Sequence, residues 1–124
     1  MKKIPATQLE IFAKDLLHAM GVQPSDAEIL WDSMAYADLR GKTTHGVARL
    51  PLYWKNIQAG TIDPQAQPVI VSDKAALAVL DACNGFGQIA AARAVKLAVQ
   101  KAKTFGISAV GVRNSNNFGA AGYY

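Results

Sequence analysis

Hydrophobic residues recur every three or four positions through the first half of the sequence. The first run comprises Leu9, Phe12, Leu16 and Met20. The second comprises Ala27, Leu30, Trp31 and Met34, and Asp38 continues the spacing. Gly21 and Gly41 follow these runs, and a third segment over 51–59 starts with Pro51 and precedes Gly60. The spacing predicts three short amphipathic helices with glycine stops, which need other elements to pack against.

The first two predicted helices each carry a candidate capping box. Thr7 is followed by Glu10, and Ser25 is followed by Glu28. In this pattern a hydroxyl side chain caps the helix, and a glutamate three residues later bonds back to the capping residue. We therefore predict that the helices begin at Thr7 and Ser25.

The second half of the sequence changes period. Short apolar runs at 69–71 and 76–80 predict strands, and Asn84-Gly85 predicts a turn. Helical spacing returns from 88 to 105, Gly106 ends it, and 107–112 is the strongest predicted strand. These elements predict a strand pair, a covering helix and a third strand.

This order of elements predicts an α/β (α+β) fold. A helical segment over 1–63 is followed at 64–124 by the first strands and covering helix of a mixed sheet. A few strands with one helix make only part of a layered domain. We therefore expect an incomplete fragment of a larger fold.

Composition limits the classes of protein to which the chain can belong. At 51% hydrophobic residues, its 124 residues are too apolar for a disordered chain, and no apolar run reaches the ~20 residues of a membrane span. The net charge of +4 is spread along the chain, so we predict no nucleic-acid partner. The polar start after Lys2 and Lys3 does not resemble a signal peptide, and Cys83 is the only cysteine. A cytoplasmic protein without a metal site or membrane partner is expected.

The first candidate site lies in the stretch from 40 to 49. His45 and Arg49 are four residues apart, so one helical turn would place them on one face. Histidine exchanges protons near neutral pH, and arginine binds a carboxylate through two parallel hydrogen bonds. The pair suits a 2-oxo or 2-hydroxy acid. The alternative is a helix–helix junction with solvent-exposed side chains.

The second candidate is the stretch Gly85-Phe86-Gly87-Gln88-Ile89-Ala90, which fits G-x-G-x-x-A. Residues 81–84 separate it from the predicted strand, and no acidic residue follows Asp81. A Rossmann site needs the glycine at the strand end and an acid for the ribose, so we do not predict one. The alternative is a close contact that requires small residues.

The third candidate is the loop from Asn114 to Gly119. Amide side chains at the end of a buried strand are well placed to bind a ligand. They equally suit a turn whose side chains bond to the local backbone. The sequence leaves both interpretations open.

Together these stretches resemble the N-terminal part of the malate/L-lactate dehydrogenase family of NAD(P)-dependent oxidoreductases, which includes ureidoglycolate, sulfolactate and diketogulonate dehydrogenases. The resemblance rests on ordered pieces: residues 37–41, 44–50, Tyr53, 60–62, Asp81, 85–88, 106–107 and 113–119. Their order and spacing cover nearly the whole chain.

The resemblance implies a fold that is not a Rossmann fold, a homodimer, and a small 2-hydroxy or 2-oxo acid as substrate. It implies NAD or NADP as the cofactor, with most of the nucleotide site formed by sequence beyond residue 124. His45 then corresponds to a proton donor and Arg49 to a carboxylate ligand. Thr44 stands where the family more often has serine, and keeps the hydroxyl.

One position departs from the family pattern. Asn117 stands where the family usually has a histidine that is treated as the catalytic acid–base. An asparagine can hydrogen-bond a substrate oxygen but cannot exchange a proton. Either His45 carries the proton, or this member is impaired, and we expect the 124-residue chain alone to be inactive. The alternative function is a non-catalytic remnant that acts as a dimerisation or ligand-binding module.

Overall fold

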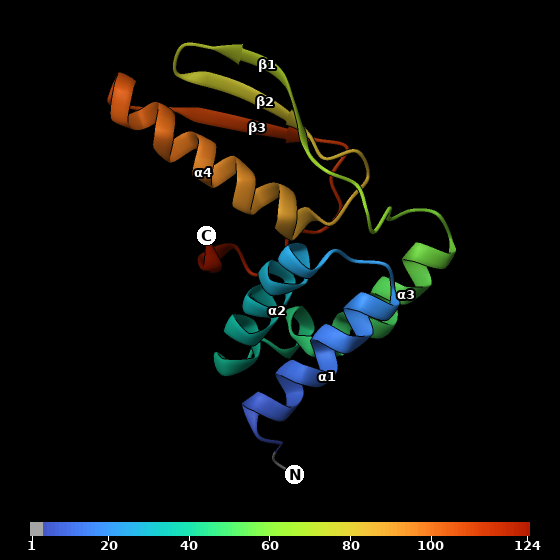
Figure 1. The fold of residues 1–124 in the computed structure, drawn as a ribbon. Coiled ribbons are helices and arrows are strands. Elements are labelled where there is room, and N and C mark those ends of the chain that lie inside the picture. Colours follow the sequence, from blue (N-terminus) through green and yellow to red (C-terminus); the bar gives the residue numbers. More distant parts are fainter. Residues whose placement is uncertain (1–3) are drawn as a thin grey trace.

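The computed structural model describes residues 4–124, so Lys2 and Lys3 lie outside the described part of the chain. Four α-helices and three strands follow the predicted order (Figure 1). They are α1 (Ala6–Ala19), α2 (Pro24–Leu39), α3 (Leu50–Gln58), β1 (Val69–Lys74), β2 (Leu77–Asp81), α4 (Gly87–Phe105) and β3 (Ala109–Arg113). Three short 3₁₀ turns complete the chain: η1 (Thr43–His45), η2 (Val47–Arg49) and η3 (Ala121–Tyr123). The predicted α/β class, with helices followed by strands and a covering helix, is confirmed.

The predicted capping boxes are wrong. The residue before α1 is Pro5 and the residue before α2 is Gln23, and neither helix start has a side-chain cap. Pro24 occupies the first turn of α2, where its fixed φ suits a helix and its missing N–H is not needed. The capping position of each helix is therefore two residues earlier than predicted, and Thr7 and Ser25 lie inside the first turns.

The two glutamates of these boxes instead share one lysine. Lys14 Nζ donates to Glu10 Oε1 and to Glu28 Oε2, each at 2.6 Å. Glu10 lies on the same helix as Lys14, whereas Glu28 lies on α2. The lysine therefore links α1 to α2, and both carboxylates raise its pKa.

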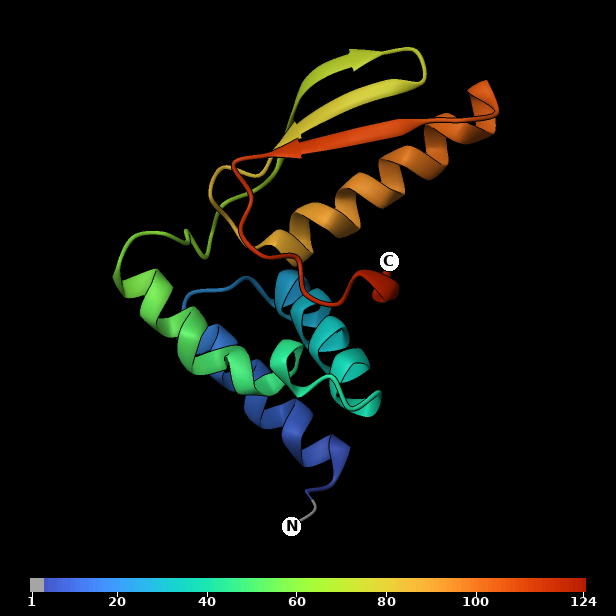
Figure 2. The same cartoon turned by 180° about the vertical axis from the view of Figure 1, so that it is seen from behind.

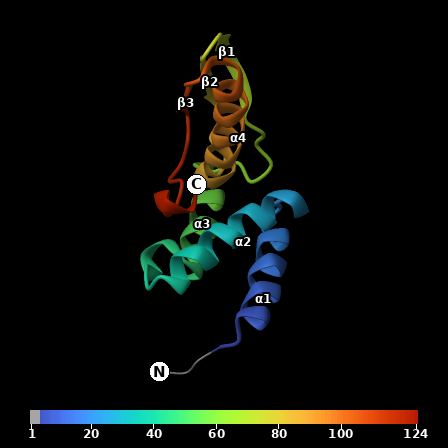
Figure 3. The ribbon, with the colours of Figure 1, turned by 90° about the vertical axis from the view of Figure 1, so that its left-hand side faces the viewer.

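The strands form one mixed sheet in the order β1-β2-β3. β1 pairs antiparallel with β2, and β2 pairs parallel with β3 across the helical connection α4. Figure 3 shows the sheet and α4 side by side at one end of the molecule, with the helices of the first half at the other end. The last strand starts at Ala109 rather than at 107, because Gly106 turns the chain with φ +80° and Ser108 Oγ bonds to Ala98 O at 2.7 Å.

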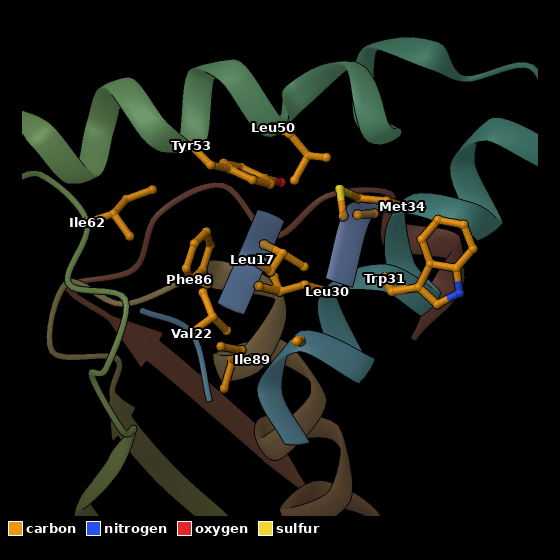
Figure 4. Packing of buried hydrophobic residues seen from close by; sticks show 12 residues of the cluster. Leu17, Val22, Leu30, Trp31, Met34, Leu50, Tyr53, Ile62, Phe86 and Ile89 are labelled. Atoms are coloured by element: carbon orange, nitrogen blue, oxygen red, sulfur yellow. The ribbon is translucent and has the colours of Figure 1, made fainter. Parts of the chain in front are cut away.

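The hydrophobic core lies among the first three helices and the start of α4 (Figure 4). The cluster comprises Ala13, Leu17, Val22, Ala27, Leu30, Trp31, Met34, Leu50, Tyr53, Ile62, Phe86 and Ile89. Within it, the rings of Tyr53 and Phe86 meet edge to face with centroids 5.2 Å apart. The core thus anchors the N-terminal end of α4 to the helices of the first half.

Candidate functional site

The connection between α2 and α3 is fastened to the end of α2. Gly41 has φ +71°, a left-handed conformation that suits glycine at a helix end. Asp38 Oδ2 accepts a hydrogen bond from Val47 N at 2.9 Å. A Cβ added to Gly46 would lie 1.8 Å from Asp38 Oδ1, so this close contact requires a glycine. Figure 2 shows the connection folded against the end of α2.

Three of the predicted site residues meet in this connection, which we call the junction (residues 44–49). Thr44 Oγ1 lies 2.9 Å from His45 Nδ1, and Arg49 Nη1 donates to Thr44 O at 3.3 Å. The predicted helical turn is absent, because Gly46 is extended and separates two 3₁₀ turns. Arg49 nevertheless reaches back to the backbone carbonyl of Thr44, the residue whose hydroxyl contacts His45.

The Arg49 guanidinium keeps unused donors. Its Cζ lies 5.6 Å from the centre of the Tyr53 ring, and its buried Nε has no partner within residues 4–124. Arg40, by contrast, is held over the Tyr36 ring at 3.6 Å and donates to Tyr36 O at 3.3 Å. Arg49 is therefore the arginine of this region that is available to an anion.

The stretch with the G-x-G-x-x-A pattern serves close packing. Gly87 is the first residue of α4, and a Cβ there would lie 2.1 Å from Asn116 O. A Cβ on Gly85 would lie 2.9 Å from Ala66 Cβ. The space in which a dinucleotide fingerprint places the pyrophosphate is filled by the backbone of Asn116 and Asn117. These contacts support the close-contact interpretation.

Asp81 joins the ends of β2 and β3. Its Oδ1 accepts from Cys83 N at 2.8 Å, and its Oδ2 accepts from Arg113 Nε at 2.8 Å and from Asn114 Nδ2 at 2.9 Å. The hydrogen bond from the Cys83 amide, with the Arg113 and Asn114 bonds, lowers the pKa of the Asp81 carboxyl. Sequence reasoning used Asp81 in the argument against a ribose ligand and as part of the family resemblance, and missed this role.

The loop from Asn114 to Gly119 uses its amides on the chain itself. Asn116 Nδ2 donates to the carbonyls of Thr61, Asn84 and Gly85 at 3.0–3.1 Å. Asn117 is exposed, and its Oδ1 accepts from Gly119 N at 2.9 Å. Within residues 4–124, no hydrogen bond joins Asn117 to Thr44, His45 or Arg49. The local-turn interpretation fits Asn117, whereas Asn116 ties the loop to distant segments of the chain.

A hollow of about 530 Å³ lies beside this loop, between α4 and the end of the chain. Its lining comprises Ala91, Val95, Val112, Ser115, Asn116, Phe118, Ala121 and Tyr124. Tyr124 Oη donates to Phe118 O at 2.7 Å, and burial raises the pKa of Tyr124 to about 12. The phenol therefore stays protonated at neutral pH and closes one end of the loop.

A larger apolar groove of about 630 Å³ borders the junction. It lies between α1 and the η2–α3 segment, and its lining comprises Leu9, Phe12, Leu16, Ala19, Met20, Val47, Ala48, Leu50, Pro51 and Trp54. Phe12 and Trp54 are about half exposed. The groove has no polar group that could orient a small acid.

Two negative findings concern only residues 4–124. No cluster of three or more histidine, cysteine or acidic side chains is placed to bind a metal ion. None of the helices in this part of the chain has the length and apolar character needed to cross a membrane.

Residues 4–124 match the malate/L-lactate dehydrogenase family. A malate dehydrogenase of Pyrococcus abyssi is 42% identical over 122 residues, covering 98% of this chain and 34% of that protein. An L-sulfolactate dehydrogenase of Methanocaldococcus jannaschii is 43% identical over 110 residues, covering 89% and 32%. The solved structure of a malate dehydrogenase from Entamoeba histolytica matches with a TM-score of 0.94 at 38% identity, over 99% of this chain and 34% of that one. The chain thus spans about a third of the length of these relatives.

Proposed function

Because the chain belongs to the malate/L-lactate dehydrogenase family, we propose that it forms part of an oxidoreductase. The reaction transfers a hydride between NAD or NADP and a small 2-hydroxy or 2-oxo acid. Relatives named malate, L-sulfolactate and hydroxycarboxylate dehydrogenase support this class of substrate. The observation that carries the proposal is the junction, where His45 and Arg49 both contact Thr44 and Arg49 keeps an unpaired donor.

In this proposal Arg49 binds the carboxylate of the acid. One Nη1 bond is made to Thr44 O, which orients the guanidinium and leaves its other donors for the ligand. A planar guanidinium matches the two oxygens of a carboxylate, and charge-assisted bonds of this kind are stronger than neutral ones. The Arg49 guanidinium lies over the face of the Tyr53 ring, with its Cζ 5.6 Å from the ring centre.

His45 exchanges the proton on the substrate oxygen. Its Nδ1 faces the Thr44 hydroxyl, which fixes the ring and leaves Nε2 for the ligand. When the hydroxyl donates to Nδ1, Nε2 carries the proton and can give it to a carbonyl oxygen. The serine-to-threonine difference at position 44 keeps this hydrogen bond.

The described residues do not by themselves fit a dinucleotide. At the N-terminus of α4 the chain's own backbone fills the space that the phosphates of a fingerprint site would need. We therefore assign no cofactor ligand within residues 4–124 and derive no step through the cofactor. NAD or NADP, a homodimer and a cytoplasmic location are part of the proposal; the half-exposed Phe12 and Trp54 beside the apolar groove support an association.

The alternative function is a non-catalytic module that binds the acid or dimerises. Asn117 favours it, because this side chain cannot exchange a proton and is bonded to Gly119. The experiment that separates the two uses the full-length oxidoreductase of which this chain is proposed to form part, called the full chain below. It is a turnover assay with L-malate, L-lactate and sulfolactate, each with NAD and NADP. Saturable cofactor reduction supports the enzyme, and acid binding without any turnover supports the module. Absence of acid binding overturns both forms of the site.

A further inference from the structure

The junction and the Asn114–Gly119 loop share no hydrogen bond within residues 4–124, yet both rest on Gln88. This residue is in the first turn of α4, where the core meets the helices of the first half. Its side chain is completely buried. In Figure 4 Phe86, two residues before Gln88, faces Tyr53 of α3, so the start of α4 packs against α3.

On the junction side, Gln88 holds Tyr53. Gln88 Nε2 donates to Tyr53 Oη, and the Tyr53 ring packs edge to face on Phe86. Tyr53 is only 2% exposed, so its ring is held both at the hydroxyl and at the edge. The Arg49 guanidinium lies over this ring. The position of Gln88 therefore bears on the position of Arg49.

On the loop side, Gln88 and Ser33 form the surface on which Gly119 rests. A Cβ at Gly119 would lie 2.9 Å from Ser33 Oγ and 3.4 Å from Gln88 Cγ. Gly119 has φ +80°, and its N–H donates to Asn117 Oδ1. The position of Gln88 therefore also bears on Asn117.

The polar character of this support is not explained by packing. Gln88 Oε1 is buried without a hydrogen-bond partner within residues 4–124. An apolar side chain of equal volume would avoid this unpaired oxygen but would lose the bond to the buried Tyr53 hydroxyl. Local conflicts of this kind are expected where geometry serves function.

We propose that Gln88 is a positioning residue that fixes Arg49, through Tyr53, relative to Asn117, through Gly119. The proposal rests on the proposed function, because it concerns the two parts of the same acid-binding site. It assigns Gln88 no contact with substrate.

The first test asks whether a change at Tyr53 is felt at Gly119. In the full chain labelled with ¹⁵N-glycine, Tyr53→Phe removes the hydroxyl that Gln88 binds and keeps the ring. We expect the Gly119 amide resonance to move. Ile89→Val, a conservative change at the adjacent and equally buried position of α4, is the matched control. A Gly119 resonance that moves no more in Tyr53→Phe than in this control overturns the proposal.

The second test separates positioning from general destabilisation. In the full chain, Gln88→Met keeps the length of the side chain and loses its amide. We expect the KM for L-malate to rise by on the order of tenfold to a hundredfold, as for a misplaced binding group, with the KM for the cofactor unchanged. Equal changes in both constants, or the same change in Ile89→Val, overturn the positioning role.

The two tests also distinguish the proposals from each other. If the parent binds no acid while Gly119 responds to Tyr53→Phe, the proposed function fails and the link through Gln88 stands. If the parent turns over the acid and Gly119 does not respond, the function stands and the link is wrong.

Discussion

The junction and the Asn114–Gly119 loop are both rich in polar side chains, but they use them differently. In the junction, Arg49 keeps a buried Nε without a partner, and His45 has one neighbour at Nδ1. In the loop, Asn116 donates to three backbone carbonyls and Asn117 accepts from Gly119. A polar residue is available to a ligand only when the local backbone has not already satisfied it. On this criterion the junction is the stronger candidate for binding and the loop the stronger candidate for support.

The largest effect expected from this comparison is on the chemical step at His45. In the full chain, His45→Ala should lower kcat by ~10²–10⁴-fold, the usual contribution of a general acid or base. Cofactor affinity should change little, because no cofactor ligand is assigned to the junction. His18→Ala, at the other histidine, is the matched control and should leave kcat unchanged. Equal kcat values for the parent and His45→Ala would show that the junction histidine is structural.

A companion variant tests the loop directly. Asn117→His introduces the side chain that the family usually has at this position. A rise in kcat identifies Asn117 as a lost proton-transfer group, whereas an unchanged kcat leaves proton transfer to His45. The measurement is the single-turnover rate of hydride transfer in the parent and in the variant.

The supporting role of the loop is tested by Gly87→Ala. The added Cβ would lie 2.1 Å from Asn116 O and 2.6 Å from two Asn117 backbone atoms, none of which can rotate away. We expect the free energy of unfolding to fall by about 3 kcal/mol, at the upper end of overpacking effects. Gly111→Ala is the control, since its nearest neighbour would be Val79 Cγ2 at 3.9 Å. Urea unfolding of both variants measures the difference, and equal midpoints would contradict the close contact.

The binding role of the junction is tested by Arg49→Lys. Lysine keeps the charge but loses the planar pair of donors, so it should not replace arginine. We expect the binding of L-malate to weaken by about 1.5–3 kcal/mol, the typical value for a hydrogen bond to a charged group. Arg93→Lys on α4, where the arginine donates to Gln67, is the matched control. Calorimetric titration of both variants that gives the parent's affinity would exclude Arg49 as the carboxylate ligand.

The smallest effect is expected on the pH dependence of stability, from the hydrogen bonds of Asp81 that join the ends of β2 and β3. The pKa of the Asp81 carboxyl is lowered in the folded chain, chiefly by the Cys83 amide and then by Arg113. This group therefore stabilises the fold above the unfolded carboxyl pKa of ~3.9, and the stabilisation is lost as the pH falls through the lower folded value. Asp81→Asn should flatten the acid limb of the stability profile. Thermal unfolding of the parent and of this variant across the acid range measures the difference, and identical acid limbs would contradict the role of Asp81.

Local pattern predicted the elements but not where they begin. The helical period of the first half and the strand–helix–strand order of the second are found in the structure. The capping boxes failed because Pro5 and Pro24 start the helices first, and because Lys14 pairs with both glutamates. A short sequence motif does not show that a glutamate will form an ion pair with a lysine on another helix.

The site shows the same limit at longer range. The four-residue spacing of His45 and Arg49 predicted a helical turn, but the structure has two 3₁₀ turns separated by Gly46. The long-range contacts around the junction and the loop were not predictable, because Gln88 meets Tyr53 from 35 residues away, Arg113 meets Asp81 from 32, and Asn116 meets Thr61 from 55. In a single sequence these residues carry no mark that distinguishes them from ordinary helix or loop positions.

The composition of the core has a consequence for synthesis of the chain. Its members extend from Ala13 to Ile89, so α1, α2 and α3 can form before the core can close. During translation the apolar faces of these helices stay exposed until Phe86 and Ile89 have left the ribosome. Exposed apolar surface of this kind favours aggregation. A pause in translation before Phe86 should therefore prolong the interval in which a nascent chain needs a chaperone, whereas a pause after α4 should not.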